Sequence, residues 1–425
     1  MPRCLLDPNC RNLPSADADG LVAVAIEHHN GVITALRGHQ QEPTKGHEPP
    51  GPHPLPLALT PLVEPHAHLD KAFSFNLFPN REATMTGALE ANGREAAERT
   101  FEQVQVRGER ALDQAWRNGV RAIRSHIDSV GPQAAASWQA LRMLRQEWAD
   151  RVVLQLVALV PISHWLKPEG ESLAREVAEA GGVLGGVLGA PFAADASDVA
   201  ALEAVLRLAC KHGCGVDLHI DESDRHPGRG LRLLAPLIKG WPRELALTCS
   251  HACSMGLMAE RPMIMLAENL AEADVSVVAL PTTNLWLLDR SHGTTPWRRP
   301  QAPIRQLQAA GVTVAIGGDN VQDPWLPGGD FDPVALMGFS LLASHLSPWH
   351  RNGLSPFTTA AARLMELDWD GVLRVGSPAD LVVLAVSSWS ELLARPPQRR
   401  VMRGGVWCPS PRAQAASGLL KSLGT

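Results

Sequence analysis

Short apolar runs alternate with longer amphipathic stretches over most of this chain. Near-continuous apolar runs of this length fit strands that are buried on both faces of a parallel sheet. Eight repeats of strand and helix favour an α/β fold of the closed (β/α)8 TIM-type barrel. The expected strands are Ala58–Val63, Gly119–Ile127, Val152–Val160, Val183–Leu188, Gly215–Ile220, Leu245–Ser250, Val275–Leu280 and Val312–Gly317.

Helical periodicity occupies the stretches between these runs and continues beyond the last of them. A doubly wound open sheet is the alternative arrangement, but no Gly-rich dinucleotide fingerprint follows an early strand to support it. Helices are expected at Glu95–Asn118, Ala134–Trp148, Ser172–Ala180, Ser197–His212, Leu231–Leu237, Ile304–Gly311, Asp332–Leu346 and Thr358–Glu366.

Strand-like segments also lie at both ends of the chain, outside the alternating region. Leu21–Ile26 and Gly31–Arg37 flank an Asn-Gly pair, which predicts a hairpin. Leu381–Val386 and Val401–Trp407 are further strand candidates near the other end. We therefore expect a small β-sandwich domain formed from residues 1–57 and 372–410, a barrel from 58–371, and a tail from 411–425, with a Pro- and Gly-rich loop at Gln40–Pro56.

Composition narrows the class of protein. A net charge of −5 gives no reason to expect a nucleic-acid partner, and no apolar run reaches the length of a membrane span. The beginning of the chain lacks the apolar run of a signal peptide. Seven cysteines, an odd and scattered number, favour a reducing cytoplasm over a disulfide framework. The oligomeric state is left open, and a homo-oligomer is compatible with the sequence.

Polar, ionisable residues follow almost every expected strand. In a barrel, the carboxyl ends of the strands form the active-site face. His66 and His68 are two residues apart, so on a strand both side chains point to the same side. Such residues are costly to bury unless they are paired or bind a metal. The others include His126, Asp128, His164, His219, Glu222, His251, Asn284, Asp319 and Asn320.

Three imidazoles and one carboxylate can hold one divalent metal ion and leave a position for water. We expect these ligands to be His66, His68, His219 and Asp319. Zinc, iron and manganese all suit such ligands, and each lowers the pKa of a bound water toward neutrality. Glu222 is expected to carry a proton from the water to the leaving group, and His251 to polarise the bond under attack. Asp319 would also orient the hydroxide.

These motifs resemble the amidohydrolase superfamily, and within it the cytosine deaminase-like branch. The resemblance covers about residues 20 to 410 and implies a mononuclear site with zinc or iron and no carbamylated lysine. It rests on Glu64-Pro65-His66-Ala67-His68-Leu69-Asp70-Lys71, Arg124-Ser125-His126-Ile127-Asp128, Asp217-Leu218-His219-Ile220-Asp221-Glu222, Ser250-His251, Thr295-Pro296-Trp297-Arg298-Arg299, Gly318-Asp319-Asn320-Val321-Gln322-Asp323-Pro324-Trp325 and Gly376-Ser377-Pro378-Ala379-Asp380-Leu381.

The resemblance implies a hydrolytic deaminase, in which hydroxide attacks an amidine-type ring carbon of a small heterocycle and ammonia leaves. Two polar positions of cytosine deaminases differ here: Ile162 replaces a glutamine, and Asn320 replaces an acidic residue. An aliphatic side chain forms no hydrogen bond, so the substrate is expected not to be cytosine. The expected substrate-binding residues are Ile162, His164, Asn320 and Trp325, with Phe73, Phe75, Phe78 and Trp286 as further candidates for the pocket wall.

Several alternatives stay open from the sequence. Glu222 could be a carboxylate at a helix start, and His251 could support the site without touching substrate. His126 and Asp128 could support the metal site or bond each other, and Lys71 is expected to form a salt bridge. The same metal site also serves hydrolases of cyclic amides or N-alkylamino heterocycles. A catalytically silent binding protein is the remaining class.

Overall fold

The computed structural model describes residues 1–39, 55–189, 195–291 and 293–409. Most of the predicted loop Gln40–Pro56 lies outside the described residues, and so does the predicted tail 411–425. The predictions for these segments are therefore not compared with the fold.

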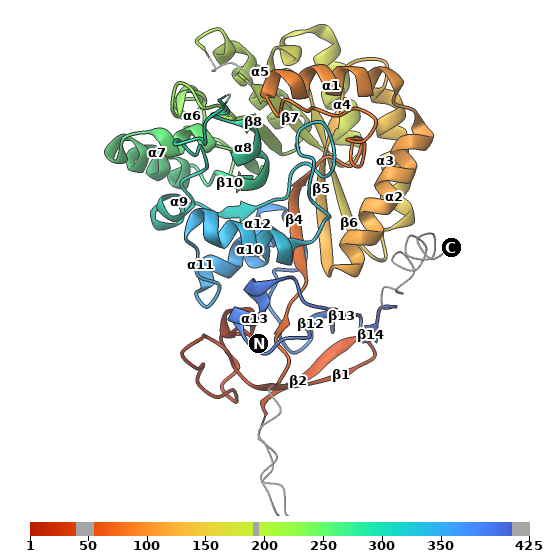
Figure 1. The fold of residues 1–425 in the computed structure, drawn as a ribbon, viewed down its shortest axis with the longest axis vertical. Coiled ribbons are helices and arrows are strands. Elements are labelled where there is room, and N and C mark those ends of the chain that lie inside the picture. The colour runs from red at the N-terminus through yellow and green to blue at the C-terminus, as the bar shows by residue number, and fades with distance from the viewer. Residues whose placement is uncertain (40–54, 190–194, 292, 410–425) are drawn as a thin grey trace, which may run out of the picture.

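Eight parallel strands form the central sheet, in the order β11-β10-β9-β8-β7-β6-β5-β4 (Figure 1). The first and last strands meet through a parallel bridge between Ala67 and Asp319, where the Asp319 N–H donates to the His66 carbonyl at 2.9 Å. This bridge nearly closes the sheet, and the predicted TIM-type barrel is confirmed. The strands are β4 (Leu62–Ala67), β5 (Val120–Asp128), β6 (Val153–Leu159), β7 (Val183–Leu188), β8 (Val216–Ile220), β9 (Leu247–His251), β10 (Ser276–Ala279) and β11 (Val314–Ile316).

Helices lie around the outside of the barrel (Figure 1), and apolar side chains of helices and strands share the buried core clusters. The α-helices are α1 (Met85–Glu98), α2 (Phe101–Arg117), α3 (Ala134–Glu147), α4 (Pro168–Glu179), α5 (Asp198–His212), α6 (Arg229–Leu234), α7 (Glu260–Glu272), α8 (Pro281–Leu287), α9 (Ile304–Ala310), α10 (Pro333–Ser344), α11 (Arg351–Leu354), α12 (Thr359–Leu364) and α13 (Trp389–Ala394). Short 3-10 helices are η1 (Arg3–Leu5), η2 (Ile162–Leu166), η3 (Cys253–Leu257) and η4 (Ser355–Phe357). None of the described helices combines the length and apolar character needed to cross a membrane.

The single helix predicted at Glu95–Asn118 is wrong, because the structure has two helices there. Arg99 leaves the helical region, with φ −69° and ψ 121°, and ends α1. Thr100 then starts α2: its hydroxyl accepts from the Gln103 N–H, and the Gln103 side chain accepts from the Thr100 N–H. This reciprocal capping satisfies the free N–H groups of a new helix start. The break places the Arg99 side chain in the protein interior, where it pairs with Asp70 at 2.7 Å.

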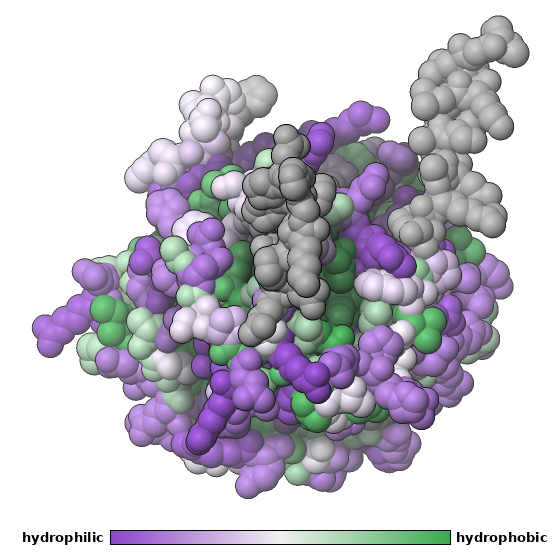
Figure 2. Space-filling model, turned by 90° about the horizontal axis from the view of Figure 1, so that it is seen from below, coloured by the Kyte–Doolittle hydropathy of each residue, from purple (hydrophilic) through white to green (hydrophobic). Residues whose placement is uncertain are grey.

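Two small antiparallel sheets combine strands from the two ends of the chain (Figure 1). Apolar side chains of both sheets share one buried cluster, which includes Ile33, Leu36, Leu381 and Met402. Seen from the side of these sheets, the surface is a mixture of hydrophilic residues with hydrophobic residues between them (Figure 2). One sheet pairs β1 (Val24–His29) with β2 (Val32–Gly38), and the other has the order β14 (Val406–Trp407), β13 (Arg399–Arg403), β12 (Leu381–Leu384) and β3 (Ala58–Leu59).

The predicted strand Ala58–Val63 is also wrong, because it divides into strands of two different sheets. Ala58 and Leu59 pair with β12 of the small sheet, whereas β4 of the barrel begins at Leu62. Pro61 lies between them and has no N–H to donate to a neighbouring strand. The chain therefore passes directly from the small sheet into the barrel, whose first strand begins four residues before His66.

Candidate metal centre and active site

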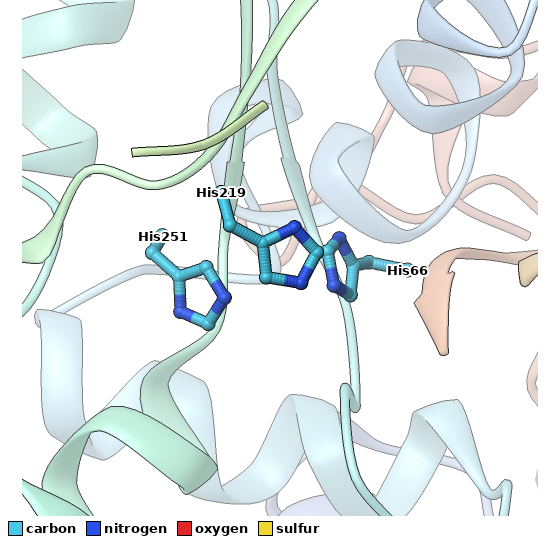
Figure 3. A group of neighbouring side chains, drawn as sticks. All are labelled: His66, His219 and His251. Atoms are coloured by element: carbon cyan, nitrogen blue, oxygen red, sulfur yellow. The ribbon is translucent and has the colours of Figure 1, made fainter. Parts of the chain in front are cut away.

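The residues expected at the strand ends meet at one end of the barrel. His66 lies near the end of β4 and His68 just after it, while His219 comes from β8, His251 from the end of β9, and Asp319 follows β11. All five side chains are buried, with at most 5% exposure. Figure 3 shows the rings of His66, His219 and His251 side by side, although they come from three different strands. The parallel topology thus brings together residues that are far apart in the sequence.

Their nitrogen and oxygen atoms lie within the range of a shared ion. Nε2 of His66 is 3.5 Å from Oδ1 of Asp319, and Nε2 of His68 is 3.2 Å from the same oxygen. The His219 ring lies 4.6 Å from that of His66 between centroids. Ligand atoms of His66, His219 and His251 also fall within 4.8 Å of one another. The cluster therefore has the donors and the compactness of a metal site.

Unpaired polar atoms at the centre of this cluster fit a metal ion. Nε2 of His66, both ring nitrogens of His219 and both carboxylate oxygens of Asp319 are buried and lack hydrogen-bond partners among the described residues. Buried polar groups are nearly always satisfied, so each such group needs an explanation. A divalent cation would satisfy Nε2 of His66, one ring nitrogen of His219 and the Asp319 carboxylate together.

The ionisation states of the cluster suit ligation. Burial, and then the rings of His126 and His219, hold the pKa of His66 well below its usual value. Burial, and then His126 and His251, do the same for the pKa of His219. Burial alone would raise the pKa of Asp319, but the close approach of the His68 ring and the neighbouring His251 outweigh it and lower that pKa. Neutral imidazoles and an ionised carboxylate are the forms that bind a metal.

A chain of hydrogen bonds behind His66 fixes which nitrogen is free. The hydroxyl of Ser250 donates to Oδ1 of Asp217 at 2.7 Å, so its oxygen accepts from Nδ1–H of His66 at 2.9 Å. Arg124 in turn donates to the second oxygen of Asp217 at 2.9 Å. His66 therefore carries its proton on Nδ1 and turns the lone pair of Nε2 toward Asp319. Such support of a ligand imidazole is common at metal sites.

The supporting residues Asp217 and Arg124 were not assigned roles from the sequence. Asp217 precedes His219 by two residues and Arg124 precedes His126 by two, which places each pair on the same side of its strand. Both are charged residues in the interior of apolar strands and are at most 2% exposed. A charged residue within an apolar strand, two positions before a histidine, was the sequence signal that could have identified these supporting residues. His126 itself stacks on His66 at 3.8 Å and does not bond Asp128.

Glu222 and His251 face each other beside the cluster. Oε2 of Glu222 lies 3.6 Å from Nε2 of His251. Burial, and then the charge of Asp319, raise the pKa of Glu222 well above its usual value and so favour its protonated form. The Asn284 amide donates to Nδ1 of His251 at 2.9 Å, which leaves the ring proton on Nε2. Burial lowers the pKa of His251 to about 4 against the attraction of Asp319, so the ring is neutral.

A cavity of about 380 Å³ opens onto this cluster and is large enough for a small ligand. Of the predicted substrate-binding residues, Asn320 and Trp325 line it. Its polar lining also includes Lys71, Asn92, Asp128, Ser129 and Gln133, and its apolar lining includes Met85, Leu89, Val130, Leu159, Val160 and Val187. Asn92 and Gln133 were not predicted from the sequence. They come from α1 and from the loop after β5, where no strand pattern marks them.

Ile162 and His164 are not among the residues that line this cavity. Ile162 is 4% exposed and packs in the core, where its Cδ1 would lie 2.7 Å from a Cβ added at Gly186. His164 is half-exposed on η2, with its ring 5.9 Å from that of Trp165. Neither of these two side chains of η2 therefore contributes to the cavity wall. Phe73, Phe75, Phe78 and Trp286 do not line the cavity either.

The family model described as "Amidohydrolase family" matches residues 80–408 of the chain. This chain belongs to the amidohydrolase family. The amidohydrolase is 33% identical to the pterin deaminase of Rhizobium rhizogenes (strain K84), over 80% of this chain and 78% of the relative. It is 24% identical to the N-isopropylammelide isopropyl amidohydrolase of Pseudomonas sp. (strain ADP), over 76% of this chain and 78% of the relative.

Solved structures show the same relationship. The 5-methylcytosine deaminase from Klebsiella pneumoniae liganded with 5-fluorocytosine superposes on the amidohydrolase with a TM-score of 0.78 and 26% identity, covering 92% of this chain and 95% of that structure. The predicted membership of the cytosine deaminase-like branch is confirmed. The amidohydrolase is thus an enzyme acting on carbon–nitrogen bonds, other than peptide bonds, in cyclic amidines, and its buried histidine and aspartate cluster is typical of the metal sites of this family.

Proposed function

We propose that the amidohydrolase is a metal-dependent hydrolytic deaminase of a small heterocycle. One observation carries the proposal: Glu222 and His251 face the same cavity as the ligand cluster, with Oε2 of Glu222 3.6 Å from Nε2 of His251. A carboxylic acid that keeps its proton at neutral pH can deliver that proton to a leaving amine. A neutral imidazole with its proton on Nε2 can donate to an oxygen on which charge develops.

In the proposed reaction, the bond between a ring carbon and its amino group breaks. The oxygen of water becomes the carbonyl oxygen on that ring carbon. One proton of the water goes to the amine, which leaves as ammonia, and the other goes to the adjacent ring nitrogen. A single divalent ion, zinc or iron, held by His66, His68, His219 and Asp319, would lower the pKa of the water toward neutrality. Asp319 accepts a hydrogen bond from the water and orients it, while Glu222 passes the protons to the two nitrogens.

The names of two relatives support deamination of a ring. The pterin deaminase is 33% identical to this chain, and the 5-methylcytosine deaminase structure shares its fold over 92% of the chain. The N-isopropylammelide hydrolase is a relative whose name specifies a different leaving amine. Release of an alkylamine is therefore the second candidate. Both candidates use the same metal site and differ only in what the cavity accepts.

Product analysis tests the proposal. The purified chain would be loaded with zinc or with iron and incubated with aminopyrimidines, aminopterins, aminotriazines, their N-alkyl derivatives and cyclic amides. We expect ammonia from an amino-substituted ring, and no turnover after the metal is removed. Alkylamine as the main product would establish the second candidate. A ring-opened acid would point to a cyclic amide hydrolase, and a chain that binds no metal would favour a silent binding protein.

A further inference from the structure

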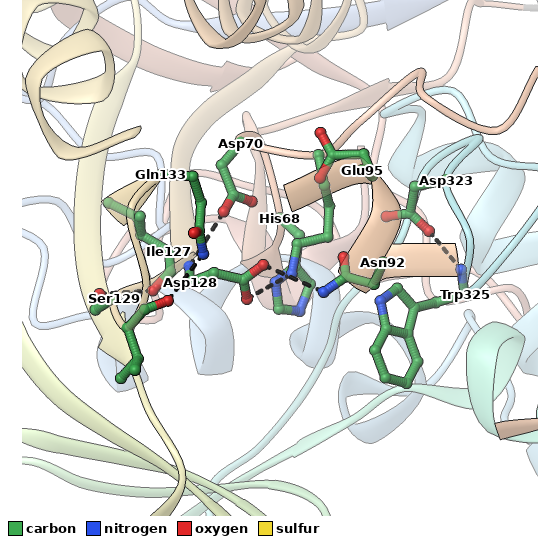
Figure 4. A network of polar contacts seen from close by, with 12 residues as sticks. His68, Asp70, Asn92, Glu95, Ile127, Asp128, Ser129, Gln133, Asp323 and Trp325 are labelled. Carbon is green, nitrogen blue, oxygen red and sulfur yellow. Dashed lines mark hydrogen bonds and ion pairs between the residues drawn. The ribbon is translucent and has the colours of Figure 1, made fainter. Parts of the chain in front are cut away.

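Three side chains of the cavity form a wall that has no part in the proposed proton transfers. Lys71 follows β4, Asn92 lies on α1, and Asp128 ends β5. The two oxygens of the Asp128 carboxylate hold the other two residues: Oδ1 accepts from Nζ of Lys71 at 2.7 Å, and Oδ2 contacts Nδ2 of Asn92 at 3.5 Å. Figure 4 shows the Asn92–Asp128 contact next to His68. We call Lys71, Asn92 and Asp128 the recognition wall.

The recognition wall presents one donor and one acceptor that are not satisfied within the protein. Among the described residues, Asp128 is the only hydrogen-bond acceptor of the Lys71 ammonium, which can donate three hydrogen bonds. Oδ1 of Asn92 is buried and has no partner in the described part of the chain. The opposite orientation of the Asn92 amide would turn this oxygen toward the Asp128 carboxylate, so the contact with Asp128 favours the orientation with Nδ2 on Asp128, on a residue that lines the cavity.

Buried charges behind the wall hold it in place. Asp128 also accepts from Arg99 at 3.1 Å, and Arg99 donates to Asp70 at 2.7 Å. Glu95 and Arg107 complete a group of three cations and three carboxylates, which is neutral overall. Because α1 ends before Arg99, the Arg99 side chain can enter this group. A ligand would therefore meet a donor and an acceptor with fixed positions.

We propose that the recognition wall binds the N–H and carbonyl edge of a 2-amino-4-oxo ring, which is a cyclic acylguanidine. In such a ring the amino-bearing carbon has a ring N–H on one side, and a carbonyl follows that N–H. The N–H would donate to Oδ1 of Asn92 and the carbonyl would accept from Lys71. The other ring nitrogen would then face Glu222, which delivers its proton. The inference rests on the proposed function, whose substrate class it specifies.

Cytosine lacks this edge in the required order. Its ring nitrogen next to the amino-bearing carbon has a lone pair and no hydrogen, so it would oppose the lone pairs of Oδ1 of Asn92. Sites that hydrogen-bond a ring edge discriminate strongly against analogues that leave a buried group unpaired. The recognition wall thus excludes cytosine by a route that does not depend on Ile162. Apolar side chains of Met85 and Leu89 continue the cavity beside the wall.

The test combines turnover with binding. Wild-type protein loaded with zinc is compared with Asn92→Leu, Lys71→Met and a control, Glu90→Gln, which changes an exposed residue of α1. The substrates are isocytosine, which has the edge, and cytosine, which does not. We expect each wall substitution to lower kcat/KM for isocytosine roughly 10- to 100-fold, without lowering that for cytosine, and Glu90→Gln to behave as wild type.

Binding of the 2,4-dioxo ring gives a readout that needs no catalysis. Uracil keeps the same N–H and carbonyl edge, whereas 3-methyluracil has a methyl group in place of the hydrogen on that ring nitrogen. Calorimetry should show uracil bound tightly by the wild type and roughly 10- to 100-fold more weakly by each wall variant, with 3-methyluracil weak throughout. Metal content and melting temperature of each variant show whether it is folded, and Asn92→Leu leaves every charge of the buried group paired.

The outcomes separate this inference from the proposed function. Ammonia release from isocytosine that is insensitive to both wall substitutions overturns the recognition wall and leaves the deaminase. Preference for cytosine over isocytosine also overturns it. Selective binding of uracil without ammonia release from any ring would overturn the proposed deaminase function. The proposal that the recognition wall binds this ring edge would then remain.

Discussion

The hydroxyl oxygen of Ser250 lies 2.9 Å from Nδ1 of His66, and the hydroxyl donates a hydrogen bond to Asp217. Ser250→Ala removes this hydrogen-bond acceptor, so the proton of the neutral His66 ring can lie on either ring nitrogen. We expect metal affinity to fall about 10- to 100-fold, as is typical for partners of ligand histidines. Competition with a metal chelator measures the change. The matched control is Ser340→Ala, a buried serine of α10 whose hydroxyl has no partner within the described residues and which should leave metal affinity unchanged.

Glu222→Gln keeps the shape of the side chain and removes its acidic proton. We expect the variant to bind metal as the wild type does and to lose roughly 10²–10⁴-fold in kcat, because a positioned proton donor contributes about that much. Steady-state ammonia release with metal analysis of the same sample gives both values. Glu268→Gln, on the exposed side of α7, is the control. Turnover equal to wild type would remove Glu222 from the proton transfers.

Removal of the metal should lower stability as well as activity. Only the folded chain brings together residues from β4, β8 and β11, so a bound ion stabilises the native state by mass action. At a free metal concentration of 100 times Kd, the gain is about 2.7 kcal/mol. A thermal scan with and without chelator measures it as a shift in Tm. His219→Ala should show a much smaller shift, and an equal shift would contradict ligation by His219.

Arg99→Met should destabilise the fold strongly. It leaves the Asp70 carboxylate and part of Glu95 buried without their main partner, and loss of one member of a buried charge group costs about 3–5 kcal/mol. The control is Arg117→Met on α2, whose ion pair with Asp113 is 33% and 40% exposed and should be worth at most about 1 kcal/mol. Urea unfolding midpoints compare the two. Equal losses would show that the group behind the recognition wall is not a structural anchor.

Much of the site follows from the chain alone, because parallel strands in a barrel bring their carboxyl ends to one face. His66, His68, His219 and Asp319 were predictable as neighbours once their strands were recognised, since each lies at or just past a strand end. The same reasoning does not reach residues on helices and connecting loops. Asn92 lies mid-way along α1, and nothing in a helical pattern tells which turn covers the cavity.

The failures have local causes. The strand expected at Ala58–Val63 looked continuous because apolar character does not reveal a change of sheet, whereas Pro61 interrupts the backbone pairing there. The helix break at Arg99 places its side chain against Asp70, which is 29 residues away in the chain, and a helical pattern does not reveal such a distant partner. Ile162 was expected beside the substrate because it stands where cytosine deaminases have a glutamine, whereas here its side chain on η2 is buried and does not line the cavity.

The closure of the barrel also has a consequence for biosynthesis. His66 belongs to the first barrel strand and Asp319 follows the last, and the backbone bridge that joins these strands also brings the two side chains together. A nascent chain that has not yet emerged beyond β11 lacks both the bridge and the carboxylate. The proposed set of four ligands is therefore complete only after about three quarters of the polypeptide has left the ribosome, and products truncated before Asp319 should bind metal more weakly than the full chain.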